Sequence, residues 1–210
     1  MTHAKVKTTC LTNCGQMSQR FKPNRDGVIL DTAMSWGEAE DAVRTNKLEV
    51  LGRSVVVQEA YNEFRMVLQT KWSSLGEYIF VSKFKCAEIP NSEDPSKLCA
   101  DKSSLRGSMD APIYHLCEND FPYYYEDDVR HLIFWKTTYP EVSAEPVAWN
   151  EEFSTKEIEE GREKVAHALA AEGAAEGRGR SCVEIIHYVN PPHLKSIEAI
   201  AHVHYLARLA

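Results

Sequence analysis

Three apolar segments in the second half of the chain have the composition of β-strands. Residues 129–136 (VRHLIFWK), 182–189 (CVEIIHYV) and 202–209 (HVHYLARL) are each about eight residues long and rich in β-branched and aromatic side chains. We interpret all three as strands of a small, mostly antiparallel sheet. The shorter apolar run at residues 78–81 is predicted to be a further strand.

Three other segments have helical signals. Ser35 and Glu38 fit the capping box, in which each side chain bonds a free backbone N–H, so a helix is predicted to begin at Ser35. Ser154 and Glu157 repeat that pattern and predict a late helix. A third helix is predicted over residues 54–74, with Gly76 as its C-terminal glycine, because apolar side chains recur every three or four positions at Val57, Tyr61, Phe64, Leu68 and Trp72.

The remaining segments indicate connections. Residues 87–112 are rich in Pro, Ser and Asp and predict a long polar insertion loop, which in compact domains is often a lid or a binding loop. Residues 137–150 and the glycine-rich stretch at 171–180 are predicted to be further loops. Intermixed helices and strands predict an α+β class, with one catalytic domain over residues 31–210.

Charge is distributed unevenly along the 210 residues. The chain has 24 Lys and Arg against 31 Asp and Glu, a formal net charge of -7, which disfavours a nucleic-acid footprint over most of the surface. Residues 1–30 are the exception: they carry five basic residues and one acid, and we interpret them as a flexible basic arm suited to phosphate contact. The other 180 residues carry a formal charge of -11.

Several protein classes are not expected. No apolar stretch approaches the ~20 residues of a transmembrane helix, and the N-terminus does not resemble a secretory signal, so we expect a cytoplasmic protein without a membrane partner. The six cysteines have no redox or zinc spacing, and we expect reduced thiols. No nucleotide-binding glycine motif or metalloprotease motif occurs, so neither a cofactor nor a metal is predicted.

Histidines on the predicted strands are the first candidates for chemistry. Because side chains alternate across a strand, His202 and His204 share one face of the last strand, and His131 shares a face with Trp135. If these faces meet in one cleft, three imidazoles converge there. Imidazole titrates near neutrality and can act as a general acid or base. A hydrogen-bonded structural histidine is the alternative for each position.

Two further segments contain candidate site residues. In the loop at residues 190–196, Lys195 is a candidate anion binder and Ser196 a candidate nucleophile beside a histidine base, unless Ser196 merely caps a short helical turn. The segment 119–128 combines an aromatic cluster with four acids, a combination that suits a planar cation such as guanidinium, although it is equally consistent with a surface turn.

Several motifs together resemble a fungal family of N-acetylglucosamine-induced proteins, whose domain has no known function. The matching motifs begin with Ser35-Trp36 and the segment Leu48–Ser54 and continue, in the family's order, through Asn119–Tyr123, His131–Trp135, Asn190–Ile197 and His202–His204. Four positions depart from the pattern, because Phe121 replaces Trp, Tyr124 replaces Gly, Ala201 replaces Glu and two prolines follow Asn190. The chain therefore resembles a divergent member.

Within this neighbourhood the chain is similar to the arginine-containing cyclodipeptide synthases of specialised metabolism. That resemblance implies an aminoacyltransferase that takes arginyl-tRNA and a second charged tRNA and releases a diketopiperazine. It implies catalytic roles for His131, His202, His204, Lys195 and Ser196. Substrate-binding roles follow for residues in the matched regions, which are Arg53, Asp120, Tyr123, Glu126, Asp127, Asp128, Trp135 and Asn190.

Two alternatives stay open. The His-x-His strand also resembles the histidine-triad nucleotide hydrolases and transferases, although Leu206 stands where their third histidine would be. The second alternative is a non-catalytic domain that binds a small molecule.

Overall fold

A four-stranded antiparallel sheet forms the centre of the molecule. The computed structural model describes residues 28–105, 112–137, 153–175, 182–197 and 200–210. The sheet has the order β3-β4-β6-β5, formed by β3 (Ile113–Glu118), β4 (Val129–Thr137), β5 (Cys182–Tyr188) and β6 (Ala201–Leu209). The three predicted strands and the α+β class are confirmed.

Helices cover both faces of this sheet. On one face, α4 (Thr155–Ala175) packs Val165 and Leu169 against alternate side chains of β4 and β6. On the other face lie α1 (Trp36–Arg44) and α3 (Leu75–Ser82), and α2 (Val55–Lys71) runs beside α3. The described residues contain no helix that is both long enough and apolar enough to cross a membrane.

Both capping predictions are confirmed. In α1, Ser35 and Glu38 exchange hydrogen bonds in a complete capping box. The Glu157 carboxylate accepts from the backbone N–H and the hydroxyl of Ser154 at the start of α4. The middle helix is also present, but it ends at Lys71.

The prediction of a strand at residues 78–81 is wrong. These residues lie in α3, where the Ser74 hydroxyl accepts the backbone N–H of Glu77. Gly76 is buried in the first turn of this helix and does not end the preceding one. The reason is physical: a short apolar run fits a buried helix as well as a strand, and here the cap at Ser74 decides between them.

Parts of the predicted loops are regular structure. The segment 87–112 contains a hairpin of β1 (Ala87–Pro90) and β2 (Leu98–Asp101), because Asn91 closes the turn with its side-chain oxygen. The stretch predicted as a loop from residue 171 continues α4 as far as Ala175. The predicted basic arm apart from residues 28–30, the connection at 138–150 and the basic tip at 176–180 lie outside the described residues.

Gly161 lies where α4 packs tightly against the sheet. A Cβ atom there would meet the hydroxyl of Tyr205 and would lie 2.9 Å from a ring carbon of Phe134. The Tyr205 side chain is fully buried, and its hydroxyl donates to the Ile158 carbonyl at 2.6 Å. An added methyl group must therefore displace a bonded side chain in a packed core.

We expect Gly161→Ala to destabilise the fold by about 1–3 kcal/mol, since overpacking outweighs the better helix propensity of alanine. Urea unfolding would measure this free energy. Gly37→Ala is the matched control, because Gly37 lies in α1 with open space around its Cβ position. Equal effects of the two substitutions would contradict the packing account.

Candidate functional site

Three histidines meet on the face of the sheet opposite α4. In the register of β4 and β6, Ile133 pairs with His204, Trp135 pairs with His202 and His131 pairs with Leu206. The ring of His131 therefore reaches diagonally to His204, with 2.9 Å between His131 Nε2 and His204 Nδ1. The predicted convergence of His131, His202 and His204 is confirmed, and all three are 5% exposed.

The hydrogen bonds around His131 and His204 define their tautomers. The backbone N–H of Tyr123 donates to His131 Nδ1 at 3.2 Å, so the proton of the uncharged ring is on Nε2 and is donated to His204. His204 then carries its own proton on Nε2, which lies 3.2 Å from the side-chain amide of Asn190. The structure places the Asn190 side-chain nitrogen at this position, and a 180° turn of the amide would bring its oxygen there to accept the proton.

His202 has the opposite tautomer. Its Nδ1 lies 2.9 Å from the backbone oxygen of Ile200, which can only accept, so Nδ1 carries the proton. Nε2 therefore holds a lone pair. The ring lies 4.8 Å from the ring of Trp135 and 5.3 Å from the ring of His204. Of the three histidines, His202 is the one whose fixed tautomer makes it ready to accept a proton.

All three rings are uncharged at neutral pH. Burial lowers the pKa of His131 to about 3, with a smaller contribution from the Arg53 guanidinium. Burial lowers the pKa of His202 to about 4, although its hydrogen bond to the Ile200 carbonyl acts in the opposite direction. Burial also lowers the pKa of His204 well below its usual value, helped by the neighbouring histidines and Arg53. The site offers neutral imidazoles in a medium from which water is largely excluded.

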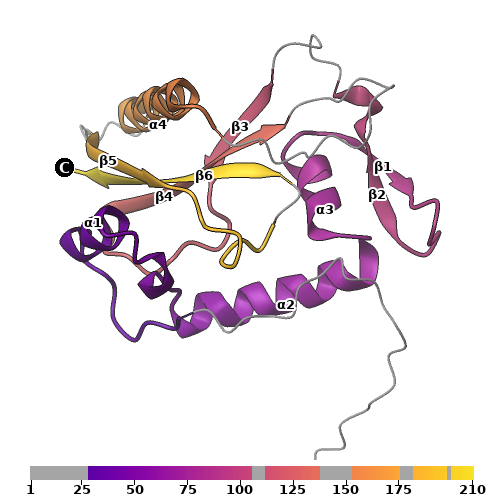
Figure 1. Cartoon of the computed structure of the whole chain (residues 1–210), viewed down its shortest axis with the longest axis horizontal. Helices are drawn as coiled ribbons and strands as arrows, with labels where there is room; N and C mark the ends of the chain where they lie inside the picture. The colour runs from indigo at the N-terminus through magenta and orange to yellow at the C-terminus, as the bar shows by residue number, and fades with distance from the viewer. Residues whose placement is uncertain (1–27, 106–111, 138–152, 176–181, 198–199) are drawn as a thin grey trace, which may run out of the picture.

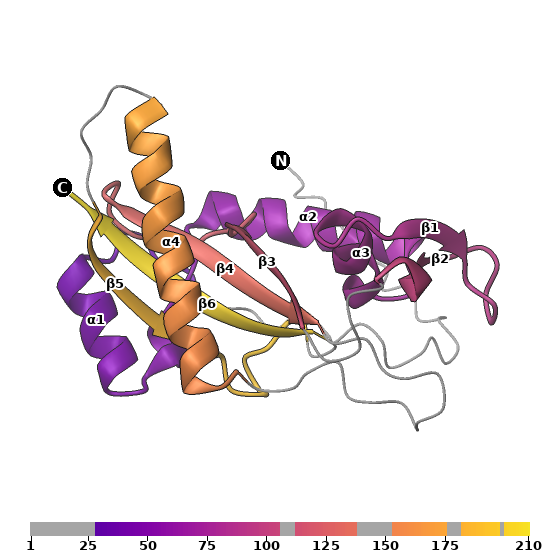
Figure 2. The ribbon, with the colours of Figure 1, turned by 90° about the horizontal axis from the view of Figure 1, so that it is seen from above.

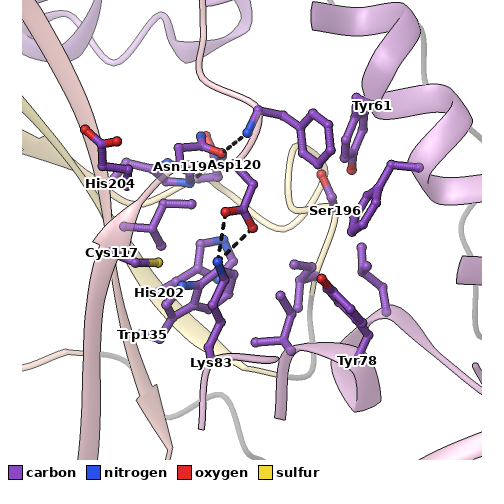
Figure 3. Close-up of a pocket in the computed structure, with 18 of the residues that line it drawn as sticks. Tyr61, Tyr78, Lys83, Cys117, Asn119, Asp120, Trp135, Ser196, His202 and His204 are labelled. Carbon is purple, nitrogen blue, oxygen red and sulfur yellow. Dashed lines mark hydrogen bonds and ion pairs between the residues drawn. The ribbon is translucent and has the colours of Figure 1, made fainter. Parts of the chain in front are cut away.

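A pocket opens beside these histidines, between the sheet and the pair α2 and α3. Its cavity volume is about 80 Å³, several times the roughly 10–15 Å³ that one water molecule needs. Histidines 202 and 204 and Trp135 lie on one wall, and the aromatic side chains of α2 and α3 lie opposite (Figure 3). Lys83 reaches Asp120 between the two walls.

Most candidate residues from the sequence lie at this pocket. Arg53, Asp120, Tyr123, Trp135, Asn190 and Ser196 line it together with His202 and His204. Arg53 is held by a hydrogen bond from Nε to the Phe121 carbonyl, and its guanidinium lies 4.3 Å from the centroid of the Tyr61 ring. Lys195 is half-buried and close enough to help lower the pKa of His202 and His204.

Three of the predicted acids lie away from the pocket. Glu126 accepts the backbone N–H of Trp36 at 3.3 Å and so caps α1. Asp127 and Asp128 are exposed in the turn before β4. Ser196 is exposed, and no hydrogen bond in the described structure joins its hydroxyl to a histidine. The structure therefore brings only Asp120 of the four acids to the pocket.

The sequence interpretation missed several residues of the site. Lys83, which follows the last residue of α3, was not a candidate, because residues 78–81 were predicted to be a strand and the end of the helix was not recognised. Tyr188, whose ring stacks on His204 at 4.8 Å, looked like one more strand residue. Asn119 lies beside His131, and it could have been chosen as a candidate because it belongs to the matched family motif.

The structure describes the surroundings of three cysteines and shows whether side chains gather to bind a metal. Cys117 lines the pocket as a free thiol, and burial raises its pKa, so it is a poor nucleophile in this state. Cys86 and Cys99 form no disulfide within the described residues. Among the residues that the structure describes, no three His, Cys, Asp or Glu side chains are arranged to hold a metal ion.

A family model and a curated relative agree with the resemblance to the N-acetylglucosamine-induced proteins. The chain is 26% identical over 183 residues to N-acetylglucosamine-induced protein 1 of Candida albicans, which covers 83% of this chain and 68% of that protein. The crystal structure of HTC1 has a TM-score of 0.49 at 19% identity, covering 84% of this chain and 85% of that one. A family model described as "Protein of unknown function (DUF3605)" matches residues 35–208. The chain therefore belongs to the DUF3605 family.

Proposed function

We propose that this chain is a tRNA-dependent cyclodipeptide synthase of fungal specialised metabolism, which joins arginine from arginyl-tRNA to a second aminoacyl group. The observation that carries the proposal is His202, an uncharged imidazole with a defined lone pair, beside a pocket that also holds a carboxylate. The motif resemblance to the arginine-containing synthases supports the choice of substrate.

The proposed reaction needs a proton acceptor at two moments. The α-amine of one aminoacyl group attacks the ester carbonyl of the other, and later the second amine closes the ring. Two ester bonds break, two amide bonds form, and each amine proton goes to the oxygen of a departing tRNA. A single base that takes each proton and returns it to the leaving oxygen completes both steps.

His202 is the base in this proposal. With a pKa of about 4 it is unprotonated at neutral pH, although it is a weak base. The attacking nitrogen becomes strongly acidic once it bonds to the carbonyl carbon, so a weak base placed beside it suffices. His131 and His204 would hold the surrounding groups in place through their hydrogen-bond chain to Asn190.

Cationic groups near the histidines would stabilise the oxyanion that forms at the ester carbonyl. Arg53 lines the pocket, and Lys195 lies near the imidazoles. Each would interact more strongly with the negative oxygen of the transition state than with the neutral carbonyl. Ser196 would become an aminoacyl carrier only if its hydroxyl moves within reach of a histidine.

Expression in a bacterial host, which supplies charged tRNAs, tests the proposal. We expect a diketopiperazine that contains arginine in the medium, measured by mass spectrometry, and its loss with His202→Ala. An exposed histidine of α4 gives the matched control, His167→Ala, which should leave the product unchanged. Soluble, folded parent protein without any such product would contradict the proposal. Release of mononucleotides from a dinucleotide would instead favour a nucleotide hydrolase.

A further inference from the structure

We propose that Asp120 receives the guanidinium group of the substrate and that Lys83 occupies the same carboxylate until the substrate displaces it. This inference rests on the proposed function for the identity of the substrate as arginine. Its physical basis is the ion pair that Lys83 and Asp120 form at the pocket.

The ammonium group of Lys83 contacts both oxygens of the carboxylate. Its Nζ lies 2.9 Å from Oδ1 and 2.8 Å from Oδ2 of Asp120. A guanidinium group binds a carboxylate through two parallel N–H bonds, one to each oxygen, and so uses the same two acceptors. The lysine therefore occupies the position that a planar cation would take.

The walls beside this ion pair suit the flat face of a guanidinium. Phe64 and Phe121 lie 4.9 Å apart between ring centroids, and Tyr78 lies 5.4 Å from Phe64. All three line the pocket with Lys83 and Asp120. Guanidinium is weakly hydrated and stacks on aromatic rings, whereas an ammonium is strongly hydrated and gains less from leaving water.

Arg53 shows that this pocket already accommodates a guanidinium between rings. Its central carbon lies 4.3 Å from the centroid of Tyr61 and 5.3 Å from that of Tyr123. Arg53 bonds a backbone carbonyl and the Gln58 side chain and has no bond to Asp120. The carboxylate of Asp120 is therefore left to Lys83 or to a ligand.

The two partners differ in how easily they are reached. The Asp120 side chain is 49% exposed, whereas that of Lys83 is only 15% exposed. Burial alone would lower the pKa of Lys83, but the hydrogen bond that its ammonium donates to Asp120 and other nearby groups raise it, so the lysine is charged. A ligand can approach Asp120 from solvent, and the displaced ammonium on its flexible side chain regains water.

The displacement model predicts opposite effects of the two substitutions on binding. The probes are L-argininamide and the neutral isostere L-citrullinamide, titrated into the full chain by calorimetry. We expect Lys83→Met to tighten argininamide binding about threefold to tenfold, because a competing cation is removed. Asp120→Asn should weaken it roughly tenfold to hundredfold, because a charged hydrogen-bond pair is lost. Citrullinamide should respond to neither substitution.

Glu88→Gln is the control, since it breaks the exposed Lys71–Glu88 pair and should leave binding unchanged. If Lys83→Met lowers the melting temperature, Lys83→Gln serves as the second variant. Weaker or equal binding in both lysine variants, or no argininamide binding by parent and variants, would overturn the inference. If argininamide binds as predicted but the folded protein forms no diketopiperazine, the proposed function is wrong and the inference about Asp120 stands. If the Asp120→Asn variant forms the product from arginyl-tRNA as fast as the parent, the inference is wrong and the proposed function stands.

Discussion

Replacing His202 by alanine is expected to lower diketopiperazine formation by about 10²–10⁴-fold, the usual contribution of a general base. The reason is that His202 Nδ1–H bonds the Ile200 carbonyl and leaves a lone pair on Nε2, whereas His131 and His204 bond each other. Initial rates with saturating charged tRNA would measure the loss. Because His202 is buried, the alanine variant leaves a cavity, and its melting temperature must be recorded.

His202→Asn separates catalysis from folding. The asparagine amide can replace Nδ1–H and donate to the Ile200 carbonyl, but it has no titratable lone pair. We expect this variant to be folded and as inactive as the alanine variant. A folded asparagine variant with parental activity would show that His202 is a structural residue.

Acid is expected to destabilise the fold well above the pH at which carboxylates titrate. Burial lowers the pKa to about 3 for His131 and about 4 for His202, and it also lowers the pKa of His204 well below its usual value. Below the pKa of about 6.5 in the unfolded chain, the unfolded state therefore binds more protons than the folded state. The contribution of these histidines to the free energy of unfolding is fully present above that pH, and it is lost as the pH falls toward their pKa values in the folded state.

The expected loss is about 3–5 kcal/mol between pH 6.5 and pH 5, since each histidine contributes up to about 1.4 kcal/mol per pH unit. Urea unfolding at a series of pH values would measure it. His131→Gln should reduce the slope by about a third. A flat free energy between these pH values would mean that the histidines are charged in the folded protein.

Periodicity was sufficient to predict which side chains share a face within each strand, but not that the two histidine faces adjoin. Alternation along β4 and β6 placed His131, His202 and His204 on common faces, and the antiparallel register then joined those faces in space. The adjacency of β4 and β6 was not predictable, because strand order depends on contacts between segments distant in sequence. The bond from His131 to His204 follows only from that order.

Local signals were weaker where two structures compete. The residues of α3 read equally well as a strand, and this ambiguity hid Lys83, because the position at the end of the helix was not apparent. The acids of the segment 119–128 illustrate the opposite error. Their composition indicated one acidic pocket, but the backbone turns there, so Glu126 caps α1 while Asp120 contacts Lys83.

The most direct test of the proposed function uses purified protein with charged tRNAs. Radiolabelled arginyl-tRNA and a mixture of other aminoacyl-tRNAs would be supplied, and the products would be separated by chromatography and identified by mass spectrometry. We predict a labelled diketopiperazine that requires arginyl-tRNA and disappears when the tRNA is treated with ribonuclease beforehand. Folded protein that forms no such product, or that forms it from free arginine and ATP, would contradict the proposed function.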